Sequence, residues 1–79
     1  MTHPTLRLFD GYDHTSPELR REVRELQRRL KKLGLPVDVD GYFGRETESA
    51  LIRFQNEHGL DSDGIAGPRT WGTLLGDPL

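Results

Sequence analysis

The chain of 79 residues contains no cysteine, one tryptophan and no long apolar segment. Without cysteine it can form neither a disulfide nor a thiolate–metal site. No apolar run approaches the roughly 20 residues of a membrane-spanning helix. The N-terminus also lacks the basic-then-apolar pattern of a signal peptide. We therefore expect one small domain with a thin core, and no insertion into a membrane.

Patterns typical of catalytic or metal sites are also missing. The sequence has no H-E-x-x-H zinc motif and no recognisable pairing of a nucleophile with a base. Residues 38–41 and 61–64 resemble the middle of a calcium loop. The twelfth position of such a loop would be Thr47 or Thr70, where a glutamate is required. We therefore expect no metal, no cofactor and no enzymatic activity.

The charged residues are distributed unevenly along the chain. Residues 18–33 carry seven Lys/Arg and three Glu, whereas the rest carries four Lys/Arg and ten Asp/Glu, and the net charge is −2. A basic helix can indicate nucleic-acid binding. However, no aromatic residue interleaves with these arginines. We interpret the segment as a solvated helix face and expect no nucleic-acid partner.

The clearest positive feature is a repeat. The pattern D-G-x-x-G-x-x-T occurs at residues 40–47 and again 23 residues later, at 63–70. Such a period indicates two copies of one supersecondary unit. Asp-Gly is typical of a turn, and Pro68 directly after Gly67 is typical of the first helical residue. Each copy is therefore predicted to be a loop that starts a helix, with the second glycine as N-cap. The residues assigned to fixing these loops are Asp40, Gly41, Gly44, Thr47, Asp63, Gly64, Gly67 and Thr70.

Apolar spacing predicts three helices. A stripe with spacings of four and three residues begins a helix near Thr15, where Thr15 and Glu18 fit a capping box, and Gly34 ends it. The stripe comprises Leu19, Val23, Leu26, Leu30 and Leu33. The second helix is predicted at about 45–58, ended by Gly59, and the third at 68–75. Thr47 and Thr70 are expected to reach back to the loop backbone. The predicted fold class is all-α, a small three-helix bundle with two structured loops.

Residues 1–14 form the least regular part of the sequence. We predict that they make an N-terminal arm, either extended and packed through its apolar residues or partly mobile. Residues 15–79 are predicted to form the three-helix domain. Within it, Phe43 and Trp71 are expected in the core, because a domain of this size depends on its few large side chains for buried area.

The motifs occur in a recognisable order over residues 19–75. An L-Q element at Leu26-Gln27 precedes the first loop, and an F-Q element at Phe54-Gln55 precedes the second. This order resembles the three-helix peptidoglycan-binding domain of bacterial wall hydrolases and phage lysins. The resemblance implies a small helical bundle that is joined to a catalytic domain and holds it on the cell wall.

Peptidoglycan offers sugar faces, amides and carboxylates, and the candidate ligand-binding residues follow from that chemistry. Tyr42 is the aromatic residue of the first loop. Arg45 and Arg69 lie in the first turns of two helices, at positions we take to match, and could bind carboxylates; solvated arginines are an equally open interpretation. Asn56 could supply an amide contact. Gln55 could do the same, or it could tie a loop to a helix.

Two functions follow from the resemblance. The first is a non-catalytic, carbohydrate-binding module that binds peptidoglycan and targets an attached or partner catalytic protein to the bacterial cell wall or envelope. The alternative is a structural or adaptor module of a phage tail or contractile injection machine. In that case the basic helix and the N-terminal arm would dock a machine-component protein.

Overall fold

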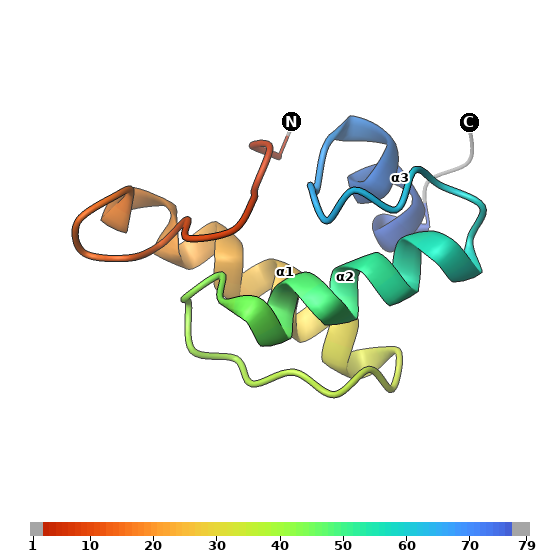
Figure 1. Cartoon of the computed structure of the whole chain (residues 1–79), viewed down its shortest axis with the longest axis horizontal. Coiled ribbons are helices and arrows are strands. Elements are labelled where there is room, and N and C mark those ends of the chain that lie inside the picture. Colours follow the sequence, from red (N-terminus) through yellow and green to blue (C-terminus); the bar gives the residue numbers. More distant parts are fainter. Residues whose placement is uncertain (1–2, 77–79) are drawn as a thin grey trace.

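The computed structural model describes residues 3–76 of the chain, and three α-helices lie within them (Figure 1). They are α1 (Arg20–Lys32), α2 (Arg45–Glu57) and α3 (Pro68–Leu75), and a 3₁₀ turn, η1 (Pro17–Leu19), leads directly into α1. The described residues contain one isolated β-bridge and no strand. The prediction of an all-α, three-helix fold is confirmed. None of these helices is long and apolar enough to cross a membrane.

Glycines end the first two helical segments as predicted. Gly34 follows α1 with a φ of +92°, and Gly59 follows α2 with a φ of +69°. Both values lie in the left-handed region, which glycine enters without the steric cost of a Cβ atom. The chain therefore turns sharply after each helix and enters a loop.

The start of the first helical segment differs from the prediction. Ser16 precedes η1, and no side chain caps its N-terminus. The Thr15 hydroxyl instead donates a hydrogen bond to the carbonyl of Phe9 at 2.6 Å. The prediction of a capping box by Thr15 and Glu18 is therefore wrong, because the Thr15 side chain bonds to the preceding arm rather than to the helix N-terminus. Leu33 also departs from the predicted stripe: it follows the last residue of α1 and is 56% exposed.

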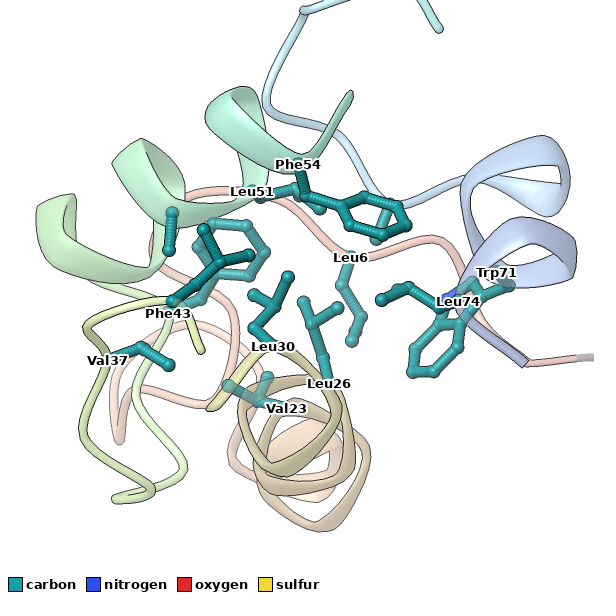
Figure 2. Close-up of a cluster of buried hydrophobic side chains, with 13 residues drawn as sticks. Leu6, Val23, Leu26, Leu30, Val37, Phe43, Leu51, Phe54, Trp71 and Leu74 are labelled. Atoms are coloured by element: carbon teal, nitrogen blue, oxygen red, sulfur yellow. The ribbon is translucent and has the colours of Figure 1, made fainter. Parts of the chain in front are cut away.

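The core is a single cluster of apolar side chains from all three helices and the segments between them. Phe43 is fully buried and Trp71 nearly so, as predicted. Leu6, from the N-terminal arm, is also fully buried. Figure 2 shows it in the middle of the cluster, between Leu26 of α1 and Phe54 of α2. The arm therefore contributes to the core of the bundle.

The arm pairs its backbone with both loops. Leu6 and Ala66 exchange two hydrogen bonds, at 3.1 and 2.8 Å. The Phe9 N–H donates to the Phe43 carbonyl at 2.7 Å, and the Phe43 N–H donates to the Asp10 carbonyl at 3.0 Å. Phe43 and Ala66 occupy the same position in the two copies of the repeat. The arm segment from Leu6 to Asp10 thus bridges two equivalent loops (Figure 1).

His3 and Pro4 of the arm contact Trp71 of α3. The Trp71 indole N–H donates to the Pro4 carbonyl at 3.0 Å, which satisfies a polar group that would otherwise be buried without a partner. The His3 ring stacks on the indole with a centroid distance of 4.2 Å, and His3 Nε2 lies 3.2 Å from Glu25 of α1. These contacts link α1 to the short α3 through the arm.

Candidate functional site

A buried glutamine on α1 fixes the first loop. Gln27 is fully buried, and its Nε2 lies 2.9–3.0 Å from Asp40 Oδ1, the Tyr42 carbonyl and Thr47 Oγ1. Its Oε1 accepts hydrogen bonds from the N–H groups of Asp40 and Gly41 at 3.0 and 2.9 Å. The amide therefore satisfies both donors and acceptors of the loop, as a buried amide must.

Gln55 on α2 fixes the second loop in the same way. Its Nε2 lies 3.0–3.1 Å from Asp63 Oδ1, the Ile65 carbonyl and Thr70 Oγ1. Its Oε1 accepts from the Gly64 N–H at 2.9 Å. Of the two interpretations of Gln55, the structure therefore shows the tie between loop and helix.

The motif residues occupy equivalent places in both copies. Gly41 and Gly64 have φ values of +85° and +73°, which their tight turns require. Gly44 and Gly67 are the N-caps of α2 and α3, as predicted.

The hydrogen-bond partners of the two motif threonines differ from the expectation. The hydroxyls of Thr47 and Thr70 accept from a glutamine side chain in the bundle rather than reaching the loop backbone. The polar side chains that the two loops share are thus used within the fold, so we expect a ligand to be contacted mainly by other residues.

The second loop borders a pocket of about 190 Å³. Its lining consists of Leu60, Asp61, Asp63, Ile65, Gly67, Pro68, Arg69 and Thr70. Leu60, Ile65 and Pro68 make part of the wall apolar, while Arg69 contributes a cation. Arg69 is exposed and forms no ion pair with another residue of the described range 3–76. The pocket can therefore offer apolar contact and the cation of Arg69, beside the carboxylates of Asp61 and Asp63.

The first loop presents an aromatic surface. Tyr42 is 36% exposed, and its ring centroid lies 5.1 Å from that of Tyr12 in the arm. The guanidinium of Arg20 lies 4.9 Å from the Tyr42 ring centroid, within the range of a cation–π contact. Tyr42 is therefore held from two sides while part of its ring faces solvent.

The two candidate arginines do not occupy matching positions. Arg45 is the first residue of α2, whereas Arg69 is the second residue of α3. The counterpart of Arg45 in the repeat is Pro68, and that of Arg69 is Glu46. The side chain of Arg45 is 79% exposed and lies 3.5 Å from Glu48. The expectation of matched cations is thus wrong, and the two side chains also differ in their partners.

The four candidate ligand residues fall into separate groups. Tyr42 and Arg45 lie at the start of α2, and Arg69 lines the second-loop pocket. Asn56 is exposed in the last turn of α2, roughly 16 Å along the helix from Arg45 at the usual rise per residue. These residues therefore do not converge on one small ligand. Residues 3–76 also contain no group of three or more His, Asp or Glu side chains that could hold a metal ion.

Two residues that shape the loops and their surfaces, Gln27 and Tyr12, were not predicted as such from the sequence. The sequence contained a signal for Gln27, because a glutamine follows an apolar residue on the helix before each loop, at Leu26-Gln27 and at Phe54-Gln55. No comparable signal marked Tyr12, since its contact with Tyr42 depends on how the arm folds back.

Comparison with known proteins places these features in a family. Residues 20–74 match the family model described as "Putative peptidoglycan binding domain". The N-acetylmuramoyl-L-alanine amidase CwlM of Mycobacterium tuberculosis is 48% identical over 54 residues, which make up 67% of this chain and 13% of the amidase.

Two solved structures are also similar. The crystal structure of the Burkholderia AP3 phage endolysin matches 96% of this chain and 26% of the endolysin, with a TM-score of 0.80 and 41% identity. The SleB N-terminal domain matches 96% of this chain and 94% of its own length, with a TM-score of 0.74 and 37% identity. The chain thus spans only a small part of the amidase and the endolysin. Because the family model covers most of the chain, including α1, α2 and both loops, this protein belongs to the peptidoglycan-binding domain family.

Proposed function

We propose that this chain is a non-catalytic module that binds peptidoglycan and so holds an attached or partner protein at the bacterial cell wall. The match of residues 20–74 to the peptidoglycan-binding family carries this proposal. The names of the amidase and the phage endolysin support it, since this chain corresponds to a small part of each. The remaining part of such proteins is free to perform another function.

The second-loop pocket is the proposed contact for the peptide part of peptidoglycan. Its apolar wall suits small aliphatic side chains, and Arg69 suits a peptide carboxylate. Arg45, by contrast, already has Glu48 as a partner at 3.5 Å. We therefore assign the main electrostatic contact to Arg69 and a smaller one to Arg45. Tyr42 and Asn56 would contact other parts of the same polymer.

A module of this size binds a single site weakly, because a small interface offsets little of the entropy lost on association. Weak binding is sufficient for a tether. Once one part of a protein is held on an insoluble polymer, the local concentration of the other part rises greatly. The proposed function therefore requires reversible retention on the wall rather than tight capture.

The test is co-sedimentation of the 79-residue chain with purified insoluble peptidoglycan. We expect retention of the folded chain, and a loss of affinity of about tenfold in Arg69→Gln, as is usual for a charge-assisted hydrogen bond. Arg45→Gln is the matched control, because it removes an arginine that also lies in a first helical turn but is paired. We expect it to weaken binding less. No retention of the folded chain would contradict the proposal.

A further inference from the structure

Exposed aromatic rings gather where the N-terminal arm meets the first loop. Phe9 is 47% exposed and Tyr42 is 36% exposed, although most other large apolar side chains are in the core. The Tyr12 ring lies between them, with centroid distances of 5.7 Å to Phe9 and 5.1 Å to Tyr42. We call these three residues the aromatic platform. Phe9 and Tyr12 precede residues 20–74, the part that matches the family model.

The backbone holds Phe9 in an unusual conformation. Its φ of +77° makes it the only non-glycine residue with a positive φ among residues 3–76. The Phe9 N–H donates to Phe43, and the Phe9 carbonyl accepts from the Thr15 hydroxyl. A bulky residue keeps such a strained conformation only where its surroundings fix it, and such positions concentrate at functional sites. In this conformation the large apolar ring of Phe9 is exposed to solvent.

The supporting residue Tyr12 is fixed as well. Its ring meets Phe9 at an interplanar angle of 84° and Tyr42 at 56°, so it fills the space between them. A Cβ atom built on Gly44 would lie 2.9 Å from the Tyr12 hydroxyl oxygen, which shows how closely this ring approaches the first loop. The platform is therefore a packed assembly of rings from two segments, rather than isolated exposed residues.

The cation over the Tyr42 ring is already in use. Arg20 donates from Nε to the Gly11 carbonyl at 2.9 Å and forms an ion pair with Asp13. Its guanidinium also faces the ring of Tyr42. A peptide carboxylate would therefore find the nearest cation occupied. What the platform offers is ring surface, and a few rings are too small an area for a stable protein interface.

We propose that the aromatic platform binds the glycan strand of peptidoglycan, with a sugar ring stacked on Phe9 and a neighbouring sugar in contact with the exposed part of the Tyr42 ring. The C–H faces of N-acetylated hexoses are apolar and flat, and they need ring surface rather than charge. Tyr12 is a positioning residue that sets the separation of the Phe9 and Tyr42 rings. This inference rests on the proposed function and divides it: the glycan strand lies on the platform, and the peptide lies at the second-loop pocket.

The experiment measures the binding of the whole chain to three samples. They are complete peptidoglycan, glycan strands whose peptides have been removed enzymatically, and free stem peptide. The variants are Phe9→Gly and Tyr42→Ala. Glycine suits the positive φ at position 9, so Phe9→Gly removes the ring while keeping the backbone conformation. Leu33→Ala is the matched control, since it removes another exposed apolar side chain, one that lies just after α1 and outside the platform.

We expect the chain to bind peptide-free glycan strands, and each platform variant to weaken this binding by about tenfold, with Leu33→Ala unchanged. Binding of free stem peptide should be the same in all variants. The proposal is overturned if the platform variants bind peptide-free strands as the original chain does. It is also overturned if the chain binds complete peptidoglycan but not peptide-free strands, a result that leaves the proposed function intact. Binding to neither polymer would overturn both.

Discussion

The two loops have nearly the same internal structure and different surroundings. In each loop, a buried glutamine bonds an aspartate, a glycine N–H and a threonine, and a glycine N-cap starts the next helix. The first loop is covered by the turn of the arm, and Tyr42 packs there against another tyrosine. In the second loop the equivalent residue is Ile65, which lines a pocket.

This difference separates the residues that fix the backbone of the loops from the residues that a ligand would contact. The glutamine networks fix the course of both loops, and the residues that make these bonds are the shared ones. Among the residues that differ between the copies, Tyr42 and Ile65 face outward or line the pocket, whereas Phe43 and Ala66 are buried in the core. One repeated scaffold therefore presents two chemically distinct surfaces.

Breaking the two glutamine networks should have the largest effect on stability. Gln27→Met and Gln55→Met keep most of the side-chain volume. They leave the buried N–H of Gly41 or Gly64 without an acceptor, and Gln27→Met also the partly buried N–H of Asp40. Gln27 accepts from two such groups, at Asp40 and Gly41, whereas Gln55 accepts from Gly64. We expect a loss of about 4 kcal/mol for Gln27→Met and about 2 kcal/mol for Gln55→Met, since each unsatisfied group costs roughly 1–3 kcal/mol.

Urea unfolding followed by circular dichroism measures both losses. A smaller loss in Gln27→Met than in Gln55→Met would show that the first network is not the stronger one. The tryptophan fluorescence of Trp71 provides an independent probe of the same transition, because the indole is buried.

Substitution of the turn glycines by alanine should have the next largest effect on stability, and this effect should differ between the two loops. Both positions have a positive φ, which costs a non-glycine residue about 1–2 kcal/mol. A Cβ on Gly41 would also collide with the Arg20 side chain, whereas one on Gly64 would lie 3.1 Å from Glu48 Cγ. We expect Gly41→Ala to lose about 2–3 kcal/mol and Gly64→Ala about 1–2 kcal/mol, as seen in thermal unfolding. Equal losses would mean that Arg20 moves aside freely.

The smallest effect should come from the threonines, and it should be the same in both loops. Thr47→Val and Thr70→Val remove one hydrogen-bond acceptor from each glutamine amide, at 3.0 and 3.1 Å. Each amide nitrogen keeps other acceptors nearby, so we expect about 1 kcal/mol for either variant. Unequal losses in chemical denaturation would indicate that the two networks are less alike than their distances suggest.

Local patterns in the sequence predicted much of this fold. The apolar spacing, the repeat and the glycines gave the three helices, their N-caps at Gly44 and Gly67, and their ends at Gly34 and Gly59. These features depend on residues close together in the chain, where periodicity and backbone preferences act directly.

Features that depend on distant residues were not predictable in the same way. The pairing of Leu6 with Ala66 joins segments 60 residues apart, and nothing in either segment specifies the other. The same holds for the contact of Tyr12 with Tyr42 that shapes the candidate glycan surface. Leu33 was misplaced because periodicity continued one residue past the end of α1.

The most direct test of the proposed division between the two loops is a chemical-shift titration. A ¹⁵N-labelled sample of the whole chain would be titrated with soluble stem peptide alone. We predict that the largest amide shifts occur around the second-loop pocket, at Ile65, Arg69 and Thr70, with little change at Tyr42. Shifts centred on Tyr42, or spread evenly over both loops, would contradict the assignment of the peptide to the second loop.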